Sequence, residues 1–198
     1  MMRPMEANEF AATAGSLRGD WRGLGVDYGT VRLTPARSEW AAIADRLAAA
    51  IRAALGERAV GVEHVGSTAV AGLAAKPILD IAVGVGDEVP AEAVKGRLEG
   101  LGYEFRGNAG DSGGLVFVLS DRPAHRVAHV HVVEHGGSQW HRYVAFRDLL
   151  LKHESARAIY ERTKGELAER FPNDRKSYQA AKEEVVRSLL ERYAASGG

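Results

Sequence analysis

The residues with the clearest chemical potential are a turn of small side chains and a carboxylate that follows it. The turn reads Gly66, Ser67 and Thr68, and it ends an apolar stretch typical of a strand. Free backbone N–H groups at such a turn, with two hydroxyls, could bind an anion such as phosphate. The same residues could instead form a tight turn that only caps a helix. Twelve residues separate Ser67 from Asp80 in the otherwise apolar run 77–83, so we expect a phosphate-binding turn that faces a strand-borne carboxylate.

Asp80 needs a partner, because a carboxylate in a central strand is costly unless it is paired or binds a metal. An ion pair with Lys76, an arginine or a histidine would satisfy it, as would a position at the exposed end of the strand. His129 and His131 are candidate metal ligands, because alternate residues of a strand share one face with side chains roughly 7 Å apart. The two histidines could equally be packed or exposed strand residues without a ligand. Glu63, just before the turn, is the nearest spare carboxylate in the sequence.

A second group of candidates lies in the C-terminal part of the chain. Tyr178 and Lys182 are four residues apart in a helical pattern and therefore share one face. Lys182 could reach a bound phosphate while Tyr178 stacks or donates a hydrogen bond; the alternative is a core tyrosine beside a solvated lysine. Arg147 could bind phosphate through both arms of its guanidinium, although its neighbour Asp148 favours a local ion pair.

The apolar periodicity predicts an α/β fold, a small mixed sheet with helices that is followed by a C-terminal helical part. Residues 1–28 lack a sustained period, so we expect a mobile or loosely docked N-terminal arm and a single domain over 29–198, with its core at 31–133 and its helical part at 138–193. Ser38 is the expected N-cap of a helix that ends near Gly56. Strands are expected at 31–33, 60–65, 78–85, 103–105, 115–119 and 127–133, and further helices at 90–101, 138–152, 155–170 and 174–193. Asp174 is the expected cap of the last helix, and Trp40, Trp140 and Phe171 are expected in the core.

Composition narrows the classes of function. The chain has 198 residues, with 26 basic and 26 acidic side chains, so no global field favours nucleic acid or an anionic membrane. The absence of cysteine excludes disulfides, a thiolate nucleophile and sulfur-ligated zinc, and it is compatible with a reducing, cytoplasmic location. The sequence contains no secretory signal pattern and no apolar run near the ~20 residues of a membrane helix. The Gly-Lys-Ser, GxGxxG and HExxH motifs are absent too.

One run of residues carries a family resemblance. Residues 64–81 read HVGSTAVAGLAAKPILDI, and with HVHVV at 129–133, FRD at 146–148 and the stretch from Tyr178 to Lys182 they resemble the GrpB-like family of predicted nucleotidyltransferases over about 31–190. The resemblance implies a nucleotidyltransferase-like mixed sheet flanked by helices. The wider superfamily signature places a second carboxylate two residues after the first, and this chain has Ala82 there.

The resemblance implies metal-assisted transfer of a nucleotidyl group from a nucleoside triphosphate to a small-molecule acceptor. In this interpretation Gly66, Ser67, Thr68, Lys76, Tyr178 and Lys182 bind the nucleotide, and Asp80 and His131 are catalytic. The metal ligands would be Asp80, His129, His131 and Glu63, and the ion Mg²⁺, Mn²⁺ or possibly Zn²⁺, because imidazole suits the latter two better. Ala82 favours an alternative, a binding protein for a nucleotide or a coenzyme-A-like phosphate ligand without chemistry. Hydrolysis of a phosphate ester at the same metal is a third interpretation.

Overall fold

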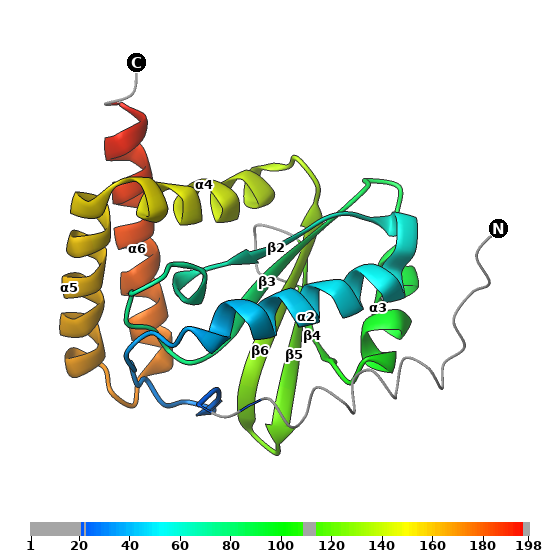
Figure 1. Ribbon diagram of the computed structural model, residues 1–198, viewed down its shortest axis with the longest axis horizontal. Helices are drawn as coiled ribbons and strands as arrows, with labels where there is room; N and C mark the ends of the chain where they lie inside the picture. The colour runs from blue at the N-terminus through cyan, green and yellow to red at the C-terminus, as the bar shows by residue number, and fades with distance from the viewer. Residues whose placement is uncertain (1–20, 22, 109–113, 196–198) are drawn as a thin grey trace.

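A mixed sheet of six strands forms the centre of the molecule in the computed structural model, which describes residues 21, 23–108 and 114–195 (Figure 1). Its strand order is β2-β3-β6-β5-β4, and β1 pairs with the beginning of β6. Only β3 and β6 are parallel; every other pairing is antiparallel. The strands are β1 Val26–Asp27, β2 Ala59–Val65, β3 Leu79–Val85, β4 Glu104–Asn108, β5 Leu115–Arg122 and β6 His125–Glu134.

Helices cover both faces of this sheet. Helices α2 (Glu39–Leu55) and α3 (Ala91–Gly100) pack on one face; in Figure 1, α2 crosses in front of the strands and α3 lies to their right. Helix α4 (Ser138–Lys152) packs on the other face, where Trp140 contacts Ala82. Helices α5 (Glu154–Arg170) and α6 (Arg175–Ala194) stand together at the side of the sheet next to α4. None of the helices in the described part of the chain combines the length and apolar character needed to cross a membrane.

The apolar residues whose spacing predicts these elements are the residues that are buried in the core. Trp40, Ile43, Leu47, Ile51 and Leu55 form the buried stripe of α2 and pack against the apolar residues of β3 and β6. The expected helices and strands from residue 39 onward agree with the structure within a few residues. The two predicted caps differ. Asp174 accepts a hydrogen bond from the Ser177 N–H, whereas the Ser38 side chain makes no capping bond.

The N-terminal region departs from the prediction. Residues 31–33 form no strand: Val31 is buried in an irregular segment, and only the next residue, Thr34, makes an isolated bridge, to Ala75. The strand of this region is β1, five residues earlier. Trp21 is 8% exposed and packs in the main core with Leu24, so the expectation of a mobile arm is wrong for the described residues from 21 onward. Residues 1–20 lie outside the described residues.

Two other features of the fold bear on the site and the sheet. Trp40 and Trp140 are buried as expected, whereas Phe171 is only half-buried at the end of α5, because it follows the last helical turn.

Strand β2 is an edge strand of the sheet, and arginines from two helices cover its outer backbone. Arg52 of α2 donates to the Val62 carbonyl, and Arg147 of α4 donates to the His64 carbonyl at 3.2 Å.

Candidate functional site

A cluster of one carboxylate and two histidines forms the centre of the candidate site. Asp80 lies opposite His129 in the parallel pairing of β3 with β6, and Ala82 lies opposite His131, so all four side chains share the face covered by α4. Asp80 Oδ1 lies 3.3 Å from His129 Nδ1 and 3.4 Å from His131 Nε2. The Tyr143 hydroxyl of α4 lies 3.4 Å from His131 Nδ1, a contact that no sequence motif indicates. The structure therefore brings Asp80 and both predicted histidines together.

The charges in this cluster follow from burial and hydrogen bonding. Burial alone would raise the pKa of Asp80, but hydrogen bonds from His129 and His131 outweigh it and hold that pKa well below the usual range. Burial lowers the pKa of His129, and the hydrogen bond to Asp80 only partly opposes that effect. At neutral pH Asp80 is therefore a carboxylate and His129 is a neutral imidazole, which are the forms that bind a metal.

The cluster fits a divalent metal ion. One ligand atom from each of Asp80, His129 and His131 can be chosen so that all three lie within 4.8 Å of one another. The nitrogen of His129 that faces Asp80 is Nδ1, whereas its Nε2 atom is buried and has no hydrogen-bond partner in the described part of the chain. One carboxylate oxygen and two imidazole nitrogens suit Mn²⁺ or Zn²⁺ better than Mg²⁺, which prefers oxygen ligands. Three protein ligands also leave a position open for substrate, as in catalytic zinc sites.

The second carboxylate of the superfamily signature has no replacement in this cluster. Ala82 is fully buried against Trp140, so an apolar contact occupies its position. Glu63 lies directly across from Ala82 in the pairing of β2 with β3. Its carboxylate Oε2 instead accepts a hydrogen bond from Arg147 Nη1 at 2.7 Å, and the structure does not bring Glu63 into the metal set. Arg147 also pairs with Asp148, which agrees with the local pairing that the sequence favours.

The small-residue turn lies directly against Asp80. Gly66 has φ +72° and ψ −170°, a region that is essentially restricted to glycine, and a Cβ there would lie 2.8 Å from Asp80 Oδ2. Only a single 3-10 turn, Ser67–Ala69, follows Gly66 in place of a longer helix. The Thr68 hydroxyl is buried and bonds within the protein, to His64 Nε2 at 3.0 Å, so it does not face a ligand as we expected. The Ser67 hydroxyl and the Gly66 backbone remain the candidates of the turn.

Basic side chains gather around Lys76, which also lies in the field of Asp80. Burial, followed by the charges of Arg175 and Lys182, lowers the pKa of Lys76 to about 8; Asp80 opposes the shift and Arg126 adds to it. Three other basic side chains and one carboxylate, Asp80, therefore act on Lys76, although acidic and basic residues balance over the whole chain. A ligand with several negative charges, such as a polyphosphate, would offset this excess.

Tyr178 and Lys182 occupy different environments on helix α6. Lys182 is half-buried and lies in the field of Asp80, which helps to raise its pKa although burial, the largest effect, lowers it. Tyr178 is 2% exposed, and burial raises its pKa to about 12. Lys182 is therefore placed to meet a phosphate, whereas Tyr178 is a core residue, the alternative that the sequence left open.

Helix α5 holds the segment that carries the turn, a role that the sequence did not reveal. The Tyr160 hydroxyl lies 3.3 Å from Ser67 Oγ. The next residue, Glu161, accepts from the Ala74 N–H at 3.1 Å, and one helical turn after Tyr160, Lys164 Nζ donates to the Ala74 carbonyl at 2.5 Å. Lys164 is 2% exposed, and burial is the main cause that lowers its pKa to about 7. The spacing of Tyr160 and Lys164, one helical turn apart, was the only available signal.

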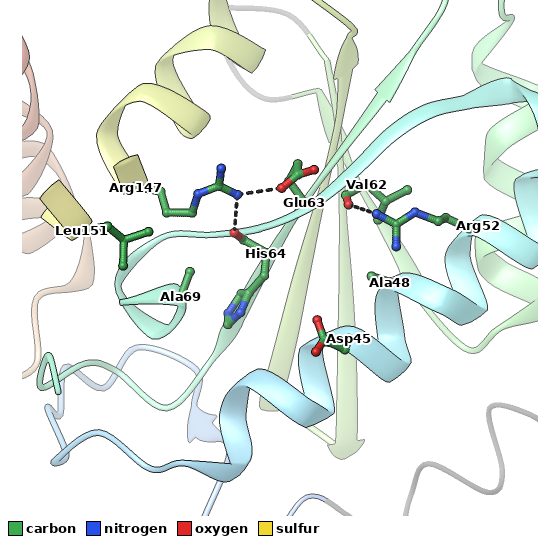
Figure 2. Close-up of a pocket in the computed structure, with 9 residues that line it drawn as sticks. All are labelled: Asp45, Ala48, Arg52, Val62, Glu63, His64, Ala69, Arg147 and Leu151. Carbon is green, nitrogen blue, oxygen red and sulfur yellow. Dashed lines mark hydrogen bonds and ion pairs between the residues drawn. The ribbon is translucent and has the colours of Figure 1, made fainter. Parts of the chain in front are cut away.

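A separate cavity of about 330 Å³ opens at the outer edge of β2, between α2 and α4 (Figure 2). Figure 2 shows Arg147 reaching from α4 toward Glu63 and the backbone of His64, with Asp45 and Arg52 on the side of α2. Its charged lining residues comprise both acids and bases. Asp80 and the two histidines of the cluster do not line it.

Comparisons with known proteins cover most of the chain. A family model described as GrpB protein matches residues 30–192. A UPF0157 protein of Pseudomonas aeruginosa is 39% identical over 173 residues, which are 86% of this chain and 71% of that protein. The crystal structure of the conserved protein GrpB from Enterococcus faecalis aligns with a TM-score of 0.71 and 30% identity over 82% of this chain and 99% of that one. A poly(U) polymerase structure aligns with a TM-score of 0.46 and 11% identity over 89% of this chain and 54% of that one.

Proposed function

The chain belongs to the GrpB family, and we propose that it transfers a nucleotidyl group from a nucleoside triphosphate to a small-molecule acceptor with a divalent metal ion. One observation carries the proposal. A cluster of Asp80, His129 and His131 that could hold a metal ion lies directly beside a glycine turn, and Asp80 acts electrostatically on Lys76 and Lys182. A triphosphate with a bound metal ion has the charges that this arrangement complements.

Each part of the site has a role in this reaction. Asp80, His129 and His131 would hold the metal, which when bound supplies positive charge for the reacting phosphate. Gly66 leaves room for a phosphate to approach the backbone, and Lys76 and Lys182 neutralise charge on the leaving pyrophosphate. These roles need no second carboxylate beside Asp80.

The bond changes are those of a direct displacement. The acceptor oxygen bonds to the α-phosphorus, the bond from that phosphorus to the pyrophosphate oxygen breaks, and the acceptor proton passes to water. The lysines remain protonated throughout. The products are the nucleotidylated acceptor and pyrophosphate.

A second function has specific support. Ala82 is buried under Trp140, so the carboxylate that usually completes a two-metal site is missing from its position. The same site would then bind a nucleotide or a coenzyme-A-like phosphate ligand without reaction. The two functions differ in one product, because only transfer releases pyrophosphate.

Calorimetric titration with ATP and Mn²⁺ tests the site. Asp80→Asn should abolish Mn²⁺-dependent nucleotide binding while it preserves the fold, because the change is nearly isosteric and removes only the charge. The matched control is Asp121→Asn, because Asp121 also pairs with a strand histidine, His125, at 2.6 Å, outside the cluster. Unchanged affinity in Asp80→Asn would remove the carboxylate from the site. If wild type binds ATP but releases no pyrophosphate from it with any acceptor that is offered, the binding function is favoured.

A further inference from the structure

Tyr28 is an exposed aromatic side chain on a fixed backbone. It is 59% exposed, one of three large hydrophobic side chains exposed in the described part of the chain. Its N–H donates to the Ala124 carbonyl at 2.8 Å, directly after the pairing of β1 with β6. Three residues later, Val31 donates to the Pro172 carbonyl at 3.0 Å in the connection between α5 and α6. A ring held in this way loses little conformational freedom when a ligand covers it.

Two guanidinium groups lie over this ring and form cation–π contacts with it. The Arg126 guanidinium carbon lies 4.3 Å from the ring centroid of Tyr28, and that of Arg175 lies 5.7 Å from it. Neither arginine forms a salt bridge within the described residues. Burial, followed by the charges of Arg175 and Arg106, lowers the pKa of Arg126. Glu104 opposes this shift, but neither guanidinium is paired directly with a carboxylate among the described residues.

This group is continuous with the candidate site. Arg126 precedes His129 by three residues on β6, which corresponds to roughly 10 Å along the strand. Arg175 precedes Lys182 on α6 by seven residues, also about 10 Å along the helix. The charges of both arginines act on Lys76. The two arginines that contact Tyr28 therefore each lie about 10 Å along their own element from a residue of the candidate site, His129 on β6 and Lys182 on α6.

We infer that Tyr28, flanked by Arg126 and Arg175, binds the planar base of a nucleotide whose phosphates lie on Lys76 and Lys182. This inference rests on the proposed function, because it assumes that the cluster binds a nucleotide. Stacking on an aromatic ring is tolerant of base identity, and guanidinium groups beside the ring add cation–π contacts. The two arginines also offer donors and positive charge to the sugar-phosphate part of the same ligand.

Two probes separate base binding from phosphate binding. ATP and inorganic tripolyphosphate, each with Mn²⁺, are titrated by calorimetry into wild type, Tyr28→Ala and Tyr28→Phe. Tyr28→Ala should weaken ATP binding about tenfold, the lower part of the range for loss of one stacked base, and leave tripolyphosphate within about twofold. Tyr28→Phe should retain ATP binding because it keeps the ring. The control is Val60→Ala, since Val60 is similarly exposed, at 58%, on the outer strand β2.

The outcomes distinguish this inference from the proposed function. If Tyr28→Ala binds ATP as wild type does, the base subsite is wrong and the proposed function stands. If ATP and tripolyphosphate lose affinity equally, Tyr28 acts only by placing the arginines, and the base subsite is again wrong. A wild-type protein that binds tripolyphosphate but not ATP, or neither probe, overturns both.

Discussion

Replacing Gly66 with alanine tests whether the turn and Asp80 act as one unit. Gly66 adopts φ +72° and ψ −170°, a region that costs a residue with a Cβ about 1–3 kcal/mol. For a chain of this size each kcal/mol lowers the melting temperature by about 2–4 °C, so a fall of about 2–12 °C is expected. The new Cβ would also lie 2.8 Å from Asp80 Oδ2 and 3.2 Å from Asp80 Cβ, so the carboxylate must move.

That movement should reach the metal cluster. Asp80 Oδ1 already lies 3.3 and 3.4 Å from the two histidine nitrogens, and metal sites tolerate about 0.2 Å of error in ligand position. We expect Gly66→Ala to weaken Mn²⁺ binding about tenfold, the scale seen when an outer-shell partner of a ligand is lost. Mn²⁺ titration by calorimetry measures this effect, and thermal unfolding followed by circular dichroism measures the stability.

Gly56 provides the matched control. Its backbone is similarly unusual, with φ +60° and ψ −138°, but a Cβ at Gly56 would meet nothing within 4 Å. Gly56→Ala should therefore lower the melting temperature by a similar amount and leave Mn²⁺ affinity unchanged. Equal Mn²⁺ affinities in Gly66→Ala and wild type would refute the coupling between the turn and Asp80.

Two further predictions concern stability. Burial lowers the pKa of His64 to about 4. Between pH 6.5 and about 4, the unfolded chain therefore binds a proton that the folded chain does not, because the unfolded histidine has its ordinary pKa. The free energy of unfolding should fall by up to about 3 kcal/mol as the pH drops through this interval. His64→Gln should reduce this slope in urea unfolding at pH 4.5 and 7.5; an unchanged slope would contradict the assignment. Trp21→Ala should cost about 3–5 kcal/mol, because the side chain is buried in the main core, whereas Val60→Ala should stay within about 0.5 kcal/mol. If thermal unfolding shows the same loss of stability for Trp21→Ala and Val60→Ala, the segment around Trp21 does not dock on the core.

The sequence predicts most of the fold because local pattern and tertiary environment agree there. The stripe of α2 and the apolar run of β3 each match the element that the core buries. The failures lie where an element depends on its neighbours. Strand β1 has two residues and exists because β6 extends past the start of β3, and Trp21 is isolated among polar and glycine residues but docks on the core.

The candidate site shows the same division. The alternation of strand residues was enough to place Asp80, His129 and His131 on one face, once β3 and β6 were neighbours. The contact of Tyr160 with Ser67 depends on where α5 docks, which the periodicity of one helix does not encode. Thr68 was assigned to a ligand because its hydroxyl suits phosphate, but the fold uses that hydroxyl to hold the turn.

The arginines on the outer backbone of β2 have a consequence for self-association. An uncovered edge strand is a template on which a second chain can add its own strand, the first step of many aggregates. Arg52 and Arg147 already donate to two outward carbonyls of β2, those of Val62 and His64. An incoming strand would have to displace two charged donors, one of which is also tied to Glu63. This edge of the sheet is thereby protected against polymerisation without a proline in β2, while Asp80, His129 and His131 lie on the two inner strands β3 and β6.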